Sequence, residues 1–204
     1  MLIIGLTGSI GMGKSTAAAR FRELGIGVFD ADAEVHKLYD KGLAAAVEAA
    51  FPGTTVCGKV DRAKLSAALL KEPEKMAKLE NIVHPAVRAR ERDFLHAEAQ
   101  RGGEIAVLEI PLLFEAGGAS AVDVIVVVSA PGDIQRARVL ARPGMSDAKL
   151  AHLLARQMND EEKRRRADFV VDTGGSIEAC HAQIDAIVAA LAAREGTAFG
   201  RHWQ

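Results

Sequence analysis

The chain has 204 residues and a mass of 21.6 kDa, which suits one domain with room for a small inserted lobe. Its 26 Lys and Arg residues nearly balance its 27 Asp and Glu residues, so the net charge of −1 excludes a polycationic coat for nucleic acid. Hydrophobic residues make up 49% of the sequence, which is enough for a sizeable core and excludes an intrinsically disordered chain.

The sequence lacks the features of membrane and secreted proteins. No apolar run approaches the ~20 residues that a membrane-spanning helix needs. The first residues, 1–5, lack the basic region and the cleavage site of a signal peptide. Cys57 and Cys180 have neither disulfide-framework nor metal-site spacing, and we expect Cys180 to pack in a core. We therefore expect a cytoplasmic globular protein, a monomer or weak homo-oligomer, that binds neither nucleic acid nor a membrane.

Short Val- and Ile-rich runs alternate with segments of helical spacing. The runs lack a period-2 pattern, which is typical of parallel strands covered by helices on both faces. After Ser176, a candidate N-cap, apolar residues recur at helical intervals as far as Leu191. This βαβ order predicts an α/β fold of three layers around a five-stranded parallel sheet. The predicted strands are residues 2–6, 27–29, 105–110, 122–128 and 169–171.

The alternation stops between about residues 33 and 103. This stretch is predicted to be a helical insert of the single domain, without a strand, in which Pro85 starts a new helix. A second excursion, at about residues 141–150, contains Arg142-Pro143-Gly144 and is predicted to form a small lid that begins as a loop between two helices. The tail, residues 196–204, is expected to be loosely ordered.

Residues 8–15 read Gly-Ser-Ile-Gly-Met-Gly-Lys-Ser and match the phosphate-binding pattern G-x-x-x-x-G-K-[ST]. A predicted strand precedes them and a helical segment, residues 16–24, follows, so backbone N–H groups can surround phosphate oxygens at a helix N-terminus. Lys14 would reach the β- and γ-phosphates of ATP, and the Ser15 hydroxyl would hold Mg²⁺. The nucleotide-binding residues predicted from this loop are Gly8, Gly11, Met12, Gly13, Lys14, Ser15 and Thr16. The fold is thus predicted to be a P-loop fold.

Asp30 and Asp32 follow the second predicted strand directly. Ligands of open parallel sheets gather outside the carboxyl ends of the strands, so we expect this pair to face the phosphate loop. One carboxylate would orient an acceptor hydroxyl and accept its proton, while the other helps to place Mg²⁺. The alternative is that one of them caps a helix at residues 33–39. His36, one turn beyond Asp32, would line the acceptor site or lie on the surface.

Arg138 and Arg142 lie four residues apart and share one face of a predicted helix. Arginines beside a mobile loop can clamp a transferring phosphoryl group, which favours Arg142 as a lid residue. The run at residues 164–166 follows two glutamates and is interpreted as a solvated basic face.

Further strings extend the pattern beyond the phosphate loop: His84-Pro85-Ala86-Val87-Arg88, Pro111-Leu112-Leu113-Phe114-Glu115, Gln135-x-x-Arg138-x-x-x-Arg142, Gln157 and Ala167-Asp168. Together with Asp30-Ala31-Asp32 they resemble the dephospho-coenzyme A kinase family, a member of the nucleoside-monophosphate-kinase-like P-loop group. The resemblance covers residues 2 to about 176. Its combination of strings is far more specific than the phosphate loop alone.

The resemblance implies phosphoryl transfer from ATP to the ribose 3′-hydroxyl of dephospho-coenzyme A, giving coenzyme A and ADP, the last step of coenzyme A biosynthesis. It implies Asp32 as the base, Lys14 and Arg142 as the groups that stabilise phosphoryl charge, and Arg138 near the nucleotide. The helical insert would form the acceptor-binding side. The expected acceptor-binding residues are Asp32, His36, His84, Arg88, Pro111, Leu112 and Glu115.

The sequence departs from the family pattern at three positions. Glu109 stands where similar enzymes often have Asp, but it still places a carboxylate near Mg²⁺. The expected metal ligands are therefore Ser15, Asp30 and Glu109. Thr173 replaces an Asn whose amide could read a base edge, which puts adenine selectivity in question. Met12 stands where a small residue is common, and we expect it to be tolerated because only its backbone needs to touch phosphate.

Two other functions remain open. The chain could be another small-molecule kinase of this architecture, acting on a nucleoside, a nucleotide or a sugar acid. The large insert and the His84-Pro85 string favour the longer acceptor, dephospho-coenzyme A. A nucleotide-dependent switch is also compatible with the fold, but it leaves Asp30 and Asp32 unexplained.

Overall fold

A computed structural model describes the backbone of all 204 residues and every side chain except that of Pro73. The strands are β1 (Leu2–Thr7), β2 (Gly27–Asp30), β3 (Thr55–Val56), β4 (Lys59–Val60), β5 (Ile105–Glu109), β6 (Val124–Ser129) and β7 (Phe169–Asp172). The α-helices are α1 (Lys14–Glu23), α2 (Ala31–Asp40), α3 (Ala44–Ala50), α4 (Arg62–Lys71), α5 (Met76–Gln100), α6 (Gly132–Leu140), α7 (Asp147–Leu154), α8 (Asp160–Arg166) and α9 (Ile177–Leu191). Three short helices complete the chain: η1 (Pro73–Lys75), η2 (Gly118–Ala121) and η3 (Phe199–Trp203).

The chain divides into two compact units. The first, here called the sheet unit, comprises residues 1–29 and 95–204, and the second, the insert unit, comprises residues 30–94. In the part of the chain that is described, no helix is both long and apolar enough to cross a membrane.

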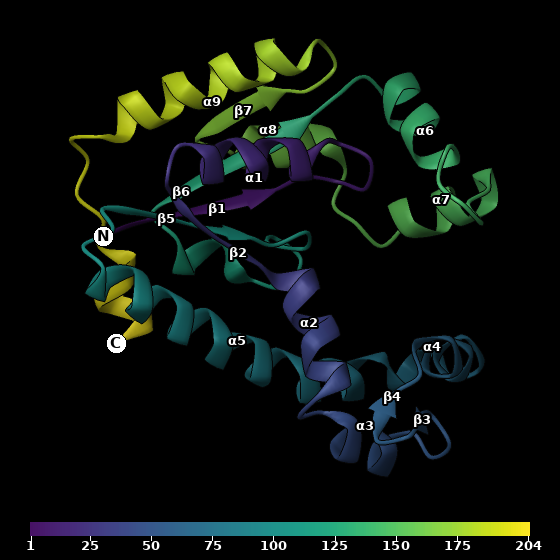
Figure 1. Cartoon of the computed structure of the whole chain (residues 1–204). Helices are drawn as coiled ribbons and strands as arrows, with labels where there is room; N and C mark the ends of the chain where they lie inside the picture. The colour runs from purple at the N-terminus through teal and green to yellow at the C-terminus, as the bar shows by residue number, and fades with distance from the viewer. The chain divides into compact units, whose positions relative to one another are not determined.

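The sheet unit is built on a five-stranded sheet in the order β2-β5-β1-β6-β7 (Figure 1). Strand β1 pairs in parallel with β5 and β6, and β6 pairs in parallel with β7. All six residues of β1 are buried, as expected for a central strand covered on both faces. The predicted α/β fold with a five-stranded parallel sheet is confirmed, and each predicted strand lies within two residues of its observed bounds.

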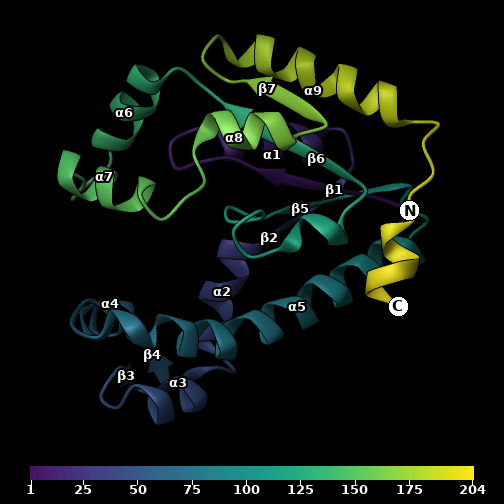
Figure 2. The ribbon, with the colours of Figure 1, turned by 180° about the vertical axis from the view of Figure 1, so that it is seen from behind.

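Helices cover both faces of this sheet. Helices α1 and α9 lie together on one face, and α8 lies over β6 on the other, as Figure 2 shows from behind. The Ser176 hydroxyl accepts a hydrogen bond from the Ala179 N–H at 3.2 Å and caps α9, as predicted. Cys180 and Ile184 of α9 pack in the main hydrophobic core, so the packing role expected for Cys180 is confirmed.

The order of the strands fixes where a ligand can bind. From β1 the chain passes to β2 and β5 on one side, and then crosses to β6 on the other side of β1. In an open parallel sheet, the crevice at such a reversal lies outside the carboxyl ends of the strands. The glycine-rich loop after β1 occupies this point.

The insert unit has its own apolar core, formed by residues of α2 to α5 and of β4. It was predicted to contain no strand, but β3 and β4 form an antiparallel hairpin. Cys57 and Gly58 form its turn, with φ of 50° and 76°, the left-handed backbone that two-residue hairpins require. Each strand has only two residues, which is too short to produce a pattern in the sequence.

Pro85 does not start a new helix as predicted, because it lies inside the 25-residue helix α5. A proline within a helix removes a backbone hydrogen bond and costs about 3 kcal/mol. Leu79 and Val83 precede it and are buried in the core of the insert unit, with Ala86 packed against them. This apolar face continues through the proline, and its burial offsets the cost of the missing bond.

The tail is ordered, contrary to expectation. Trp203 is completely buried, and its indole N–H donates to the Ala121 carbonyl at 2.8 Å. The Asp123 carboxylate accepts N–H groups of Ile3, Thr197 and Ala198 at 2.6–2.9 Å. Burial acts to raise the pKa of Asp123, but these hydrogen bonds outweigh it and hold the pKa below its usual value.

Candidate active site

The phosphate loop follows β1 and has glycine at the positions where its backbone is left-handed. Gly8, Gly11 and Gly13 have φ of 155°, 79° and 82°. A Cβ atom on Gly8 would lie 2.6 Å from the carbonyl oxygen of Val128, and a Cβ atom on Gly13 would lie 2.9 Å from Thr173 Oγ1. These glycines are therefore required both by backbone conformation and by close packing.

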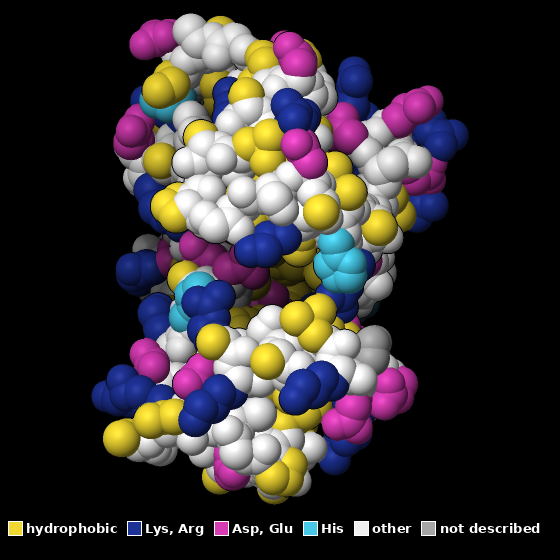
Figure 3. Space-filling model, turned by 90° about the vertical axis from the view of Figure 1, so that its right-hand side faces the viewer, with side chains coloured by type: hydrophobic (Ala, Val, Ile, Leu, Met, Phe, Trp, Pro, Cys, Tyr) yellow, Lys and Arg dark blue, Asp and Glu magenta, His cyan; other side chains and the backbone are white. Residues whose placement is uncertain are grey.

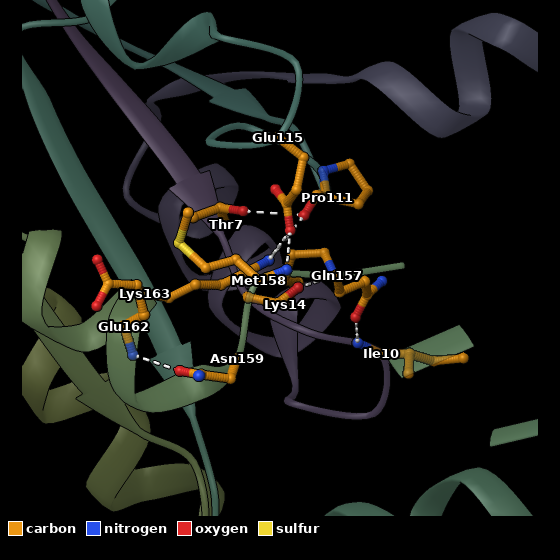
Figure 4. A network of polar contacts seen from close by, with 11 residues as sticks. Thr7, Ile10, Lys14, Pro111, Glu115, Gln157, Met158, Asn159, Glu162 and Lys163 are labelled. Carbon is orange, nitrogen blue, oxygen red and sulfur yellow. Dashed lines mark hydrogen bonds and ion pairs between the residues drawn. The ribbon is translucent and has the colours of Figure 1, made fainter. Parts of the chain in front are cut away.

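Helix α1 begins at the end of this loop, and the N–H groups of its first turn face no acidic side chain of that turn. Its N-cap is Gly13, which offers no side-chain oxygen, and no acidic residue stands in the first turn. The positive end of the helix dipole therefore has no anionic side chain on its own first turn. Lys14 donates from Nζ to the Gly8 carbonyl at 2.8 Å, so its ammonium group lies over the loop (Figure 4).

Thr173 replaces the expected amide with a hydroxyl that braces the phosphate loop. It is buried, and Oγ1 donates to the Met12 carbonyl at 2.8 Å. Arg138 donates to the Thr173 carbonyl at 2.7 Å, which places Arg138 of α6 beside the loop after β7. Met12 itself is buried in the core, and its sulfur accepts the Ala130 N–H at 3.1 Å.

The predicted lid region forms two helices joined by a short loop. Helix α6 ends at Leu140 and α7 begins at Asp147, so the predicted loop between two helices is confirmed. Arg142 lies in this loop and is exposed. Arg136 forms a two-point ion pair with Asp147 at 2.7 and 2.8 Å, which joins the two helices across the loop.

In the insert unit, Asp30 and Asp32 have different surroundings. Asp30 is the N-cap of α2, and its Oδ1 accepts the Ala33 N–H at 2.9 Å. The capping alternative is thus confirmed for Asp30, and the helix starts at Ala31 rather than at residue 33. Asp32 and His36 lie one turn apart on α2 and are both exposed.

Helix α5 carries the residues that the family pattern suggests for the acceptor, and one that the sequence did not reveal. His84 is exposed, and Arg88 lies one turn further along the same face. Arg88 approaches Glu91 at 3.7 Å. Glu91 is only 4% exposed, and burial raises its pKa to about 7. In the sequence, the one signal for the burial of Glu91 is its helical spacing from the apolar residues of α5.

At the end of β5, the backbone comes close to the phosphate loop. Glu109 is buried and pairs in register with Leu6 of β1, two residues before Gly8. The Thr7 hydroxyl donates to the Pro111 carbonyl at 3.1 Å. Leu112 is 41% exposed and available for contact.

Glu115 has a partner that the sequence did not indicate. Lys163 of α8 is completely buried, and its ammonium lies 3.1 Å from Glu115 Oε1 and 3.4 Å from the Pro111 carbonyl (Figure 4). The same Glu115 oxygen accepts the Met158 N–H at 2.7 Å. The following arginines, residues 164–166, are exposed, as interpreted from the sequence. The sequence gives Lys163 no distinguishing signal within this basic run.

The oxygen donors near the loop fit a magnesium ion. Mg²⁺ prefers hard oxygen ligands and usually takes one or two from the protein and others from phosphates. Ser15 presents an exposed hydroxyl in the first turn of α1. Glu109 holds a carboxylate at the end of the strand beside the loop.

A separate pocket of about 420 Å³ opens beyond the ends of β6 and β7. It is lined by Ser129, Asp160, Arg164 and Asp172, among others, and by none of the predicted site residues. The Asp160 Oδ2 atom accepts the Ser129 hydroxyl at 2.6 Å.

The side chains on the surface carry mixed charges. On the face drawn in Figure 3, Lys and Arg side chains are interspersed with Asp and Glu over both units.

Comparisons with known proteins agree over nearly the whole chain. A family model described as dephospho-CoA kinase matches residues 2–179. The dephospho-CoA kinase of Mesorhizobium japonicum is 55% identical over 197 residues, which are 97% of this chain and 100% of that protein. The crystal structure of TT1252 from Thermus thermophilus has a TM-score of 0.79 at 37% identity, covering 93% of this chain and 97% of that one. Dephospho-CoA kinase from Campylobacter jejuni has a TM-score of 0.70 at 26% identity, with 93% and 96% covered.

Proposed function

The chain belongs to the dephospho-CoA kinase family, and we propose how its own residues transfer the γ-phosphoryl group of ATP to the ribose 3′-hydroxyl of dephospho-coenzyme A. The observation that carries the residue assignments is the phosphate loop, in which left-handed glycines lead into a helix with no acidic first turn. The products of the reaction are coenzyme A and ADP.

The phosphate loop and Lys14 hold the β- and γ-phosphates. Lys14 already lies over the loop, bound to the Gly8 carbonyl, and exchanges that partner for phosphate oxygens when ATP binds. Because the ammonium group is fixed to the loop, little reorganisation is needed for it to stabilise the charge of the transferring group.

Asp32 is the base in this proposal. Its carboxylate is exposed in the first turn of α2, whereas that of Asp30 is engaged in capping the helix. Asp32 accepts the proton of the 3′-hydroxyl as that oxygen bonds to the γ-phosphorus, and the bond from phosphorus to the bridging oxygen of ADP breaks. Of the two carboxylates, Asp32 is thus assigned to proton transfer, and Asp30 caps the helix.

Ser15 and Glu109 are the residues of the sheet unit that would hold Mg²⁺, and Asp30 would contribute through the oxygen that does not cap α2. When bound, the ion supplies positive charge to the phosphate oxygens. The protein residues orient the phosphates around it.

Arg138 and Arg142 belong to the lid side of the site. Arg138 is fixed by Thr173 and lies near the nucleotide, while Arg142 is exposed in the loop after α6. Closure of residues 141–147 on ATP brings Arg142 to the phosphoryl group and excludes water, so that the acceptor rather than water is phosphorylated.

The acceptor lies against residues that display exposed or partly exposed surface. His36, His84 and Arg88 of the insert unit supply polar groups, and Pro111 and Leu112 of the sheet unit supply apolar surface. Glu115 contributes to acceptor binding indirectly. Its ion pair with Lys163 fixes the segment that carries Leu112. We also expect the protein to act in the cytoplasm as a monomer or weak homo-oligomer.

The test is ADP release by the purified protein with Mg-ATP. Dephospho-coenzyme A is compared as acceptor with adenosine, AMP, pantetheine and gluconate. Strong stimulation by dephospho-coenzyme A alone, with coenzyme A as product, is expected. Stimulation by another of these acceptors instead would overturn the acceptor assignment while leaving the phosphoryl-transfer chemistry. ADP release that no acceptor stimulates would contradict both.

A further inference from the structure

Both peptide groups of one residue in the phosphate loop are bound by glutamine side chains. The Ile10 N–H donates to Gln157 Oε1 at 3.2 Å, as Figure 4 shows. The Ile10 carbonyl accepts from Gln135 Nε2 at 2.8 Å. Ile10 lies between Ser9 and Gly11, in the stretch of the loop that surrounds phosphate.

The two glutamines come from opposite flanks of the lid. Gln135 lies in α6, before residues 141–147, and Gln157 lies after α7. Ile10 therefore connects the phosphate loop to the segment before the lid and to the segment after it.

The contact with α6 is tight as well as polar. Gln135 is 7% exposed, and a Cβ atom on Gly11 would lie 2.6 Å from the Val139 side chain and 3.1 Å from the Gln135 carbonyl. Helix α6 is thus packed against the backbone of the loop. The loop cannot shift towards α6, and the Ile10 carbonyl is fixed by the amide of the buried Gln135.

On the other flank, Glu115 and Lys163 support the backbone next to Gln157. The Met158 N–H donates to Glu115 Oε1, and Glu115 is paired with the buried Lys163. This pair fixes the backbone next to Gln157, which orients the Gln157 side chain towards Ile10. The Lys163 ammonium is completely buried, so the loss of its carboxylate partner would be costly and the pair provides a rigid support.

We infer that Gln135 and Gln157 are positioning residues, which set the ATP-binding conformation of the phosphate loop from the two flanks of the lid. They touch the loop and not the reacting atoms. Because Ile10 is held on both sides, the loop is ordered before ATP arrives, and binding costs less conformational entropy. The inference rests on the proposed role of residues 8–15 in binding ATP.

The kinetic test replaces each glutamine by Met, which keeps its length and removes its hydrogen bonds. Gln135→Met and Gln157→Met are each expected to raise the KM for ATP about tenfold, while the KM for dephospho-coenzyme A and the kcat at saturating ATP stay within about twofold. Gln100→Met, at an exposed glutamine of α5, is the matched control and is expected to change neither constant. An unchanged KM for ATP, or an equal rise for both substrates, would overturn the inference.

The double variant tests whether both side chains act through Ile10. If they do, releasing one peptide group already frees the loop, and the double variant raises the KM for ATP by much less than the product of the single effects, which is about a hundredfold. A full product would show that the two glutamines act independently and would contradict the coupling.

Glutamate variants separate hydrogen bonding from packing, because Glu keeps the acceptor and loses the donor. Hydrogen exchange of the Ile10 amide, followed by NMR without ATP, should stay slow in Gln157→Glu and become faster in Gln157→Met and in Gln135→Glu. Equal exchange in all of them would overturn the inference even if a Met variant failed to fold. If the wild-type protein showed no ATP-dependent transfer, the proposed function would fail, but this exchange measurement would still test the positioning contacts.

Discussion

The phosphate loop and the insert unit present their chemistry in opposite ways. In the site that we propose, backbone groups of the loop bind phosphate, and the left-handed backbone requires glycine at 8, 11 and 13. The roles proposed in the insert unit belong to side chains on the surfaces of α2 and α5, and each depends on which way its helix faces. A site made by backbone imposes a strict residue pattern, whereas a site made by side chains on helices imposes almost none.

The largest effect is expected at the loop. Lys14→Met should lower kcat/KM by about 10³-fold, because the ammonium group stabilises charge on the transferring phosphoryl group. Steady-state kinetics with Lys64→Met, an exposed lysine of α4, provides the control. A loss below tenfold would show that the loop backbone acts without its lysine.

The second largest effect is expected at the ion pair of Lys163 and Glu115, which is made by side chains but lies in the sheet unit. Lys163→Met should lower the free energy of unfolding by about 3 kcal/mol, because it removes the charge-assisted hydrogen bond between the buried ammonium and the Glu115 carboxylate. Urea denaturation measures this change. Arg165→Met in the same helix removes an exposed charge and should change stability by less than about 0.5 kcal/mol. Equal effects of the two variants would mean that the ion pair contributes nothing.

In the insert unit, Asp32→Asn should lower kcat about 10²-fold and leave the KM for ATP unchanged, because the base is lost while the phosphate loop is intact. Asp40→Asn, at the other end of α2, is the control. An unchanged kcat in Asp32→Asn would reduce Asp32 to an acidic residue in the first turn of a helix.

The smallest effect is a pH dependence of stability. The folded pKa of Glu91, about 7, lies above its unfolded value near 4.5, so the folded state binds more protons between these values. The stabilisation is complete below pH 4.5 and is lost as pH rises through 7, about 2 kcal/mol between pH 5 and 8. Urea midpoints across this range should show a flatter profile in Glu91→Gln than in the wild type or in Glu80→Gln, an exposed site on the same helix. Parallel profiles would contradict the raised pKa of the buried Glu91.

The sequence predicted the sheet and the phosphate loop because both depend on local patterns. Apolar runs identify strands buried on both faces, and the glycine spacing identifies the loop. Pro85 misled the prediction because a local rule for helix starts was outweighed by apolar contacts on either side of it. The hairpin β3–β4 was missed because strands of two residues have no period.

Other features depend on contacts between distant residues. Lys163 sits in a run of basic residues, and only its packing against the segment that ends at Glu115 distinguishes it from its exposed neighbours. The sequence marks Thr173 only by the amide that it lacks. In the structure its hydroxyl donates a hydrogen bond to the Met12 carbonyl, 161 residues away in the sequence. Such contacts cannot be predicted from a single sequence, because nothing in the local pattern specifies the partner.

The Asp123 carboxylate has a consequence for synthesis on the ribosome. It binds Ile3 in β1 and also Thr197 and Ala198, which follow α9 and so come after every strand in the sequence. The nascent chain therefore contains every strand of the sheet before the carboxylate can gather its full set of amide donors. Trp203, which donates to the Ala121 carbonyl, also comes after the last strand. Synthesis of β7 therefore does not complete this fold, because residues beyond it still have to bind Asp123 and Ala121.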